Sequence, residues 1–142
     1  RHGIALTRKT GIDTYGMFIL GYPGESYQDG LKTIEFAREL KLDYANFCAV
    51  TPFPGTKLYN DVKDSPGFRG YETMSMFDVS YVSADVTESE MKDLVEKSSK
   101  RFYLRPDYVA SRLTPEKLNS WEDLKRYGRG FAMVLSDLSV RT

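Results

Sequence analysis

The sequence predicts an α/β protein built from parallel β/α units. Two apolar, β-rich runs, residues 12–20 and 44–51, are separated by a stretch in which apolar residues recur every three or four positions. The order strand, amphipathic helix, strand at these lengths requires a parallel pair joined by a right-handed crossover. The chain has 142 residues, 41% of them hydrophobic and 28% charged, which is typical of one globular domain.

The first half of the chain shows the expected starts and stops. Residues 1–10 predict the last turns of a helix that ends at Gly11. The run 12–20 has little alternation, which is typical of a strand covered on both faces. Ser26 is placed to cap a helix of residues 27 to about 41, and Thr56 to cap a short helix after the second run.

The second half predicts an irregular segment and a helical extension. Residues 63–86 are rich in Gly, Ser, Pro and Tyr, with Met74, Met76 and Phe77 as expected anchors. Residues 87–90 match a capping box, Pro106 is placed to begin a further short helix, and residues 120–138 predict a final one. The expected division is therefore 1–62, 63–86 and 87–142.

Composition excludes several classes of function. Twenty basic residues balance twenty acidic ones, so nothing indicates a nucleic-acid or membrane partner, and no apolar run approaches the roughly 18 residues that cross a bilayer. Cys48 is the one cysteine and His2 the one histidine, which leaves no disulfide and no predicted metal site. Cys48 is expected to be a small buried strand residue. We expect a cytoplasmic protein.

The stretch FILGYPGES, residues 18–26, connects the first run to its helix. Ligands of parallel α/β folds bind beyond the carboxyl ends of the strands, where such loops lie. Gly21 would allow a ligand to approach the backbone, Pro23 and Gly24 set a tight turn, and Glu25 stands beside the helix start. The glycine spacing matches neither a dinucleotide-binding loop nor a P-loop.

The stretch TPFPGT, residues 51–56, occupies the same position one β/α step later. Adjacent loops of this kind face the same side of a sheet, so the two could line one pocket. On spacing alone, two interpretations stay open: plain connecting turns, or two walls of a ligand site.

Together, GYPGES and TPFPGT followed by Leu-Tyr resemble the C-terminal half of a radical S-adenosylmethionine (SAM) barrel. The pattern is similar to the cobalamin-binding class of that superfamily, which includes the anaerobic magnesium-protoporphyrin monomethyl ester cyclase, and to the methylthiotransferases. The resemblance extends to about residue 113 through the phrase FYLRP, residues 102–106. It implies a partial six-strand TIM-like barrel, with this chain supplying the fifth and sixth β/α units.

The resemblance also implies which residues flank the adenine of SAM. Glu25 is expected to fix its loop first and to contact a ligand second. The expected cofactor-binding residues are Phe18, Leu20, Gly21, Glu25, Ala49, Val50 and Thr51.

The sequence departs from the family in one respect that decides its chemistry. The CxxxCxxC segment, whose thiolates hold a [4Fe–4S] cluster, is absent, and Cys48 alone cannot replace it. The resemblance thus implies a parent enzyme that cleaves SAM reductively and acts on a small-molecule substrate, with cobalamin left open. We expect this chain to be a piece of that parent, inactive by itself, with no catalytic residue and no bound cofactor.

Two alternatives remain from the sequence. The chain could instead be a non-catalytic module that self-associates through exposed sheet edges. Arg105 beside Asp107 could bind a carboxylate, although an ion pair between the two is the expected arrangement.

Overall fold

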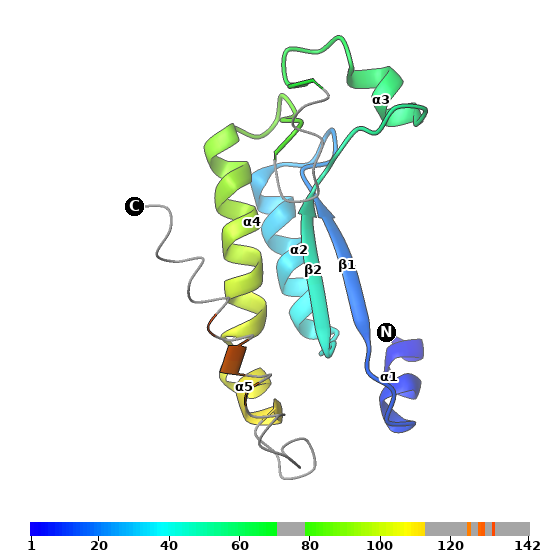
Figure 1. Cartoon of the computed structure of the whole chain (residues 1–142), viewed down its shortest axis with the longest axis vertical. Helices are drawn as coiled ribbons and strands as arrows, with labels where there is room; N and C mark the ends of the chain where they lie inside the picture. Colours follow the sequence, from blue (N-terminus) through cyan, green and yellow to red (C-terminus); the bar gives the residue numbers. More distant parts are fainter. Residues whose placement is uncertain (71–78, 113–124, 126–127, 130–131, 133–142) are drawn as a thin grey trace. The chain divides into compact units, whose positions relative to one another are not determined.

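The computed structural model describes residues 1–70, 79–112, 125, 128–129 and 132. Residues 1–98 form one compact unit and residues 99–142 a second. The elements, in chain order, are α1 (His2–Lys9), β1 (Tyr15–Leu20), α2 (Tyr27–Glu39), β2 (Tyr44–Ala49), α3 (Lys57–Val62), α4 (Glu88–Tyr103) and α5 (Pro106–Arg112) (Figure 1). The predicted α/β class is confirmed, and the three predicted segment boundaries stay predictions.

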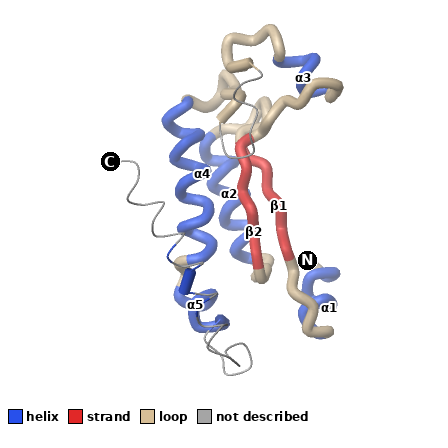
Figure 2. Tube along the Cα trace, viewed as in Figure 1, coloured by secondary structure: helices blue, strands red, loops and turns tan. Residues whose placement is uncertain are grey.

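The two strands form a parallel sheet, as predicted (Figure 2). Their register runs from Tyr15 opposite Tyr44 to Leu20 opposite Ala49. One further bond, from the Val50 amide to the Leu20 carbonyl at 2.9 Å, continues the pairing past the end of both strands. Both strands therefore end at the same edge of the sheet.

Thr14 and Asp43 hold the two strands together where they begin. One carboxylate oxygen of Asp43 accepts hydrogen bonds from the amide and the hydroxyl of Thr14, each at 2.9 Å. The Asp43 amide donates to the Thr14 hydroxyl at 3.0 Å, and the Tyr44 amide donates to the Thr14 carbonyl at 2.9 Å. Thr14 is buried, so these bonds are shielded from water.

The strand β1 is covered on one face only, which corrects the prediction of a strand buried on both faces. Leu20 is fully buried, whereas Tyr15, Met17 and Ile19 are 62%, 67% and 60% exposed. The helix α2 contacts β1, and successive side chains of a strand point to opposite faces. The alternate residues Tyr15, Met17 and Ile19 thus lie on the face of β1 that the described residues leave open.

Within the first unit, α2 and the part of α4 up to residue 98 lie side by side (Figure 1). A Cβ at Gly30 of α2 would lie 2.6 Å from a methyl group of Leu94, so the missing side chain lets the helices approach closely. The Tyr27 hydroxyl donates to Asp93 at 2.6 Å, and Lys97 pairs with the same carboxylate at 2.8 Å. The predicted capping box of α4 is confirmed, because the Glu90 amide donates to the Thr87 hydroxyl at 3.2 Å and the Glu90 carboxylate accepts from the Thr87 amide at 2.8 Å.

A small apolar cluster follows β2. Val50, Val62 of α3 and Tyr81 are buried together, with Leu58 and Phe68 packed against them. Phe68 and Tyr81 form an antiparallel bridge. Within the described part of the predicted irregular segment no helix or strand occurs, as expected; its predicted anchors Met74, Met76 and Phe77 lie outside the described residues.

In the second unit, α5 begins at Pro106, as predicted. The guanidinium of Arg105 lies 4.5 Å above the ring of Phe102 and 5.4 Å above that of Tyr108. Most of the predicted final helix, residues 120–138, lies outside the described residues. Within the described ranges, no helix has the length and apolarity that a bilayer crossing requires.

Candidate functional site

The first corner, between β1 and α2, is closed by a tight turn of residues 22–25. The Glu25 amide donates to the Tyr22 carbonyl at 2.9 Å, and Gly24 has a φ of +87°. Proline followed by a glycine at positive φ is the signature of a type II turn. The Glu25 carboxylate accepts from the Tyr22 amide at 3.0 Å, so Glu25 fixes the loop as expected.

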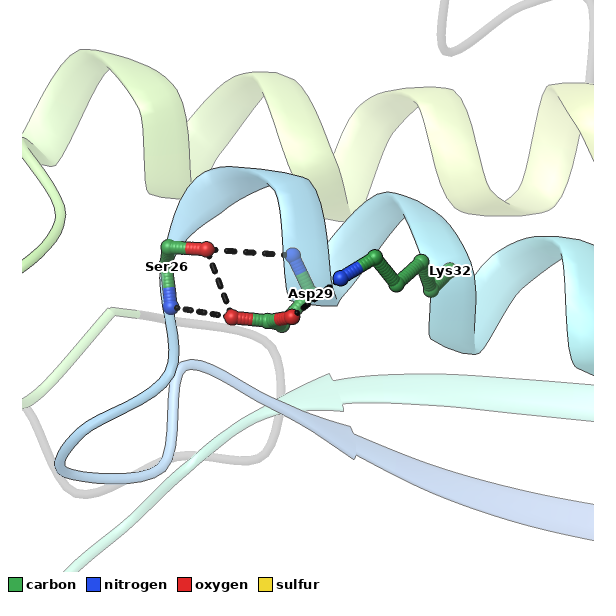
Figure 3. A network of polar contacts seen from close by, with 3 residues as sticks. All are labelled: Ser26, Asp29 and Lys32. Carbon is green, nitrogen blue, oxygen red and sulfur yellow. Dashed lines mark hydrogen bonds and ion pairs between the residues drawn. The ribbon is translucent and has the colours of Figure 1, made fainter.

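The helix α2 begins with a closed polar network of Ser26, Asp29 and Lys32 (Figure 3). The Ser26 hydroxyl accepts from the Asp29 amide at 3.3 Å, and the Asp29 carboxylate accepts from the Ser26 amide and hydroxyl at 3.1 and 2.6 Å. The hydrogen bonds from Lys32 and Ser26 hold the pKa of Asp29 far below its ordinary value. These groups satisfy one another, so their role is to start α2 at a fixed place.

Gly21 joins the strand to the turn in a conformation that disfavours any side chain. Its φ is +78°, and a Cβ at this position would lie 2.5 Å from the sulfur of Met91 in α4. The residue is buried. The corner thus packs tightly against α4, and a side chain at this position would displace that of Met91 as well as strain the backbone.

The second corner, after β2, repeats the turn of the first. The Thr56 amide donates to the Phe53 carbonyl at 3.1 Å, and Gly55 has a φ of +86°. The Thr56 hydroxyl caps α3 by accepting from the Tyr59 amide at 3.1 Å. Both corners therefore combine an aromatic-Pro-Gly turn with a capping hydroxyl.

The two corners leave the sheet at the same edge, because both strands end there. The pKa of Lys57, the first residue of α3, is raised by its hydrogen bond and ion pair with Asp61. The aromatic side chains that open the two turns, Tyr22 and Phe53, are 51% and 47% exposed. Neither ring is among the predicted site residues, although their shared place before Pro-Gly is visible in the sequence.

The structure brings the seven predicted cofactor-binding residues to this edge, but the side chains of three of them lie in the core. Phe18 stacks on Phe47 with ring centroids 5.1 Å apart, and Leu20 is fully buried. Ala49 and Val50 are also buried. Contact of these residues with SAM stays a prediction.

Thr51 has a different setting from the buried residues before it. It is half-buried, and its hydroxyl lies 3.4 Å from the Ala49 carbonyl. With the backbone of Gly21 and the two exposed aromatic rings, it provides the groups at this edge that a ligand could contact. These groups suit a flat, mostly apolar ring with a few hydrogen-bonding atoms.

No group of three metal-ligating side chains occurs among the described residues. Cys48 is buried in β2, as expected, and its sulfur accepts a hydrogen bond from the Asn46 amide group at 3.3 Å. A single buried thiol does not fit a [4Fe–4S] cluster, which needs several thiolates. Arg105 and Asp107 form the expected ion pair at 3.5 Å.

Three curated proteins match most of the chain. An uncharacterized methyltransferase of Pyrococcus horikoshii is 33% identical over 108 residues, which cover 72% of the chain and 23% of that protein. Anaerobic magnesium-protoporphyrin IX monomethyl ester cyclases of Rubrivivax gelatinosus and Cereibacter sphaeroides are 24% and 27% identical, with 82% and 74% of the chain and 21% and 17% of those proteins covered.

The chain is distantly related to radical SAM-type enzymes over part of its length. The cyclases belong to the class that the two corner motifs resemble, and the methyltransferase is likewise named as an enzyme. The chain spans about a fifth of the length of these curated relatives. No family model matches the sequence.

Replacing Gly21 by alanine should destabilise the first corner more than replacing Gly24. Both glycines have positive φ, which should cost about 1 kcal/mol for alanine. Only Gly21 faces a close neighbour, Met91, whereas the position of a Cβ at Gly24 is open. We expect Gly21→Ala to lower the free energy of unfolding by about 2–4 kcal/mol and Gly24→Ala by about 1 kcal/mol, measured by urea denaturation. Equal losses would contradict the packing of this corner against α4.

Proposed function

We propose that the chain is a section of the catalytic domain of a radical SAM enzyme, and that its two corners form part of the adenine pocket and the substrate mouth. The observation that carries the proposal is the parallel register of β1 and β2. It brings GYPGES and TPFPGT, the two motifs that resemble this superfamily, to one edge of one sheet. The distant relationship to a cyclase and a methyltransferase supports the same assignment.

The proposed architecture is a partial TIM-like barrel in which β1 and β2 are neighbouring strands. The open face of β1, with Tyr15, Met17 and Ile19, supports this assignment, because the interior of such a barrel is packed with apolar side chains. In a complete barrel these three side chains would contact those of other strands.

The chain's proposed share of the site is to bind and orient the adenosyl part of SAM. Backbone groups at Leu20 and Gly21 would flank the adenine from one corner, and those at Ala49, Val50 and Thr51 from the other. The side chain of Phe18 supports the first corner from the core through its stacking on Phe47. Glu25 acts indirectly by holding the loop closed.

The cluster that supplies the electron for cleavage of SAM would be held by another part of the protein, since the residues of this chain do not fit it. We propose a small-molecule substrate and a cytoplasmic oxidoreductase or cyclase-type reaction, with cobalamin as a further cofactor of the class. The balanced charge of the chain supports neither a nucleic acid nor a membrane as partner.

The test uses the protein encoded by the complete open reading frame. Reconstituted anaerobically with iron and sulfide, it should develop an iron–sulfur chromophore and release 5′-deoxyadenosine from SAM in the presence of a reductant. The 142-residue chain, treated identically, should do neither. A complete reading frame without CxxxCxxC would overturn the proposal.

The second candidate function is a module that self-associates through the sheet. The open apolar face of β1 favours it, as does the composition of that strand, YGMFIL, which contains none of the charges or prolines that protect edge strands.

Self-association should be visible by light scattering at high protein concentration. If β1 is the interface, Met17→Lys should give a monomer, because a charged side chain on an edge strand opposes pairing. Ile12→Lys is the matched control, since Ile12 is 61% exposed but precedes β1. A clean monomer for the unmodified chain, or equal effects of both variants, would contradict this function.

A further inference from the structure

A cavity of about 400 Å³ lies in the first unit, between residues 65–69 and residues 81–88. None of the seven residues assigned to the SAM site lines it. Its volume falls in the range of small-molecule sites.

The walls of the cavity are fixed by backbone pairing. The Val82 amide donates to the Gly67 carbonyl at 3.0 Å, and the Arg69 amide donates to the Ser80 carbonyl at 3.1 Å. A Cβ at Gly67 would lie 1.9 Å from the Val82 carbonyl oxygen, so the two segments approach as closely as the backbone allows. The cavity is therefore built into the fold.

Two serine hydroxyls at the wall have no hydrogen-bond partner among the described residues. They belong to Ser65 and Ser83, whose residues line the cavity while the hydroxyl oxygens themselves point away from solvent. Buried hydroxyls usually have a hydrogen-bond partner. Two such hydroxyls without one beside the same cavity indicate that a polar ligand group is missing. The remaining wall includes apolar groups of Tyr81 and Val82, which suit the non-polar body of a ligand.

Arg69 is the one cation among the described residues that line the cavity. Both terminal nitrogens of its guanidinium bond the Glu88 carboxylate. Glu88 has a second partner, because the Lys92 ammonium lies 2.6 Å from it. The hydrogen bonds from Arg69 and Lys92 lower the pKa of Glu88 to about 2, so the carboxylate is ionised at neutral pH.

This arrangement makes Arg69 a cation that can change partner. If the guanidinium turned into the cavity, Glu88 would keep its ion pair with Lys92. A planar guanidinium pairs with a carboxylate through two parallel hydrogen bonds. The two nitrogens that bind Glu88 would bind the carboxylate of an acidic ligand in the same way.

We propose that the cavity binds a small organic carboxylate, with Arg69 leaving Glu88 to hold the acid group and the hydroxyls of Ser65 and Ser83 rotating into the cavity to complete its contacts. The inference does not rest on the SAM site, which involves other residues. Its failure would leave the proposed radical SAM function untouched.

The test is a titration of the ¹⁵N-labelled chain with phenylacetate and with its uncharged analogue phenylacetamide, followed by NMR. Phenylacetate should give saturable shifts of the backbone amides of Gly67, Val82 and Ser83, and should bind at least about fivefold more tightly than the amide. No saturable shifts at millimolar concentration, shifts confined to other regions, or equal affinity for both probes would overturn the proposal.

Two variants with opposite expected effects separate ligand binding from a merely structural ion pair. Arg69→Gln should abolish the preference for the acid, whereas Glu88→Gln should strengthen phenylacetate binding several-fold because Arg69 is no longer held. Lys57→Gln, which removes an exposed cation paired with Asp61 on α3, is the control and should change neither. If Glu88→Gln binds phenylacetate more weakly while its NMR spectrum keeps the dispersion of a folded protein, Arg69 does not exchange Glu88 for the ligand, and the proposal is contradicted.

Discussion

The structure of the first unit depends on the parallel pairing of β1 with β2, and that pairing is fixed where the strands begin. Thr14 and Asp43 exchange three hydrogen bonds through backbone and side chains, and the ladder continues to the bond between Val50 and Leu20. A shift of the strand register by one residue would break the hydrogen bonds between Thr14 and Asp43. It would also turn the side chains of one strand to the opposite face. Because both strands are six residues long and start together, their corners leave the sheet at one edge.

The local features of this fold could be predicted from the sequence because each depends on a few neighbouring residues. The caps at Ser26 and Thr56, the turns at Pro23-Gly24 and Pro54-Gly55, and the helix start at Pro106 are of this kind. The hydrogen bonds between Thr14 and Asp43 could not be predicted, since the two residues are 29 positions apart in the sequence. The prediction that β1 is buried on both faces was wrong. An apolar run indicates that a strand is suited to burial, but it does not indicate whether neighbouring elements are present to cover it.

In the candidate site, too, some features could be predicted from the sequence and others could not. The sequence predicted that the two corners leave the sheet on the same side and that Glu25 closes its own loop. It did not reveal that the side chains of Leu20, Ala49 and Val50 are buried, or that the rings of Tyr22 and Phe53 at the same edge are exposed. The cavity beside Arg69 was also invisible, because it arises from pairing between Gly67 and Val82, fifteen positions apart in the sequence.

The register of the sheet is the claim on which the shared edge of the two corners rests, and it can be observed directly. Scalar couplings across hydrogen bonds, measured by NMR on the ¹³C,¹⁵N-labelled chain, identify each amide donor together with its carbonyl acceptor. The structure predicts couplings from the Tyr44 amide to the Thr14 carbonyl and from the Val50 amide to the Leu20 carbonyl. Couplings displaced by one or two residues along either strand, or an antiparallel pattern, would separate the two corners and contradict the account.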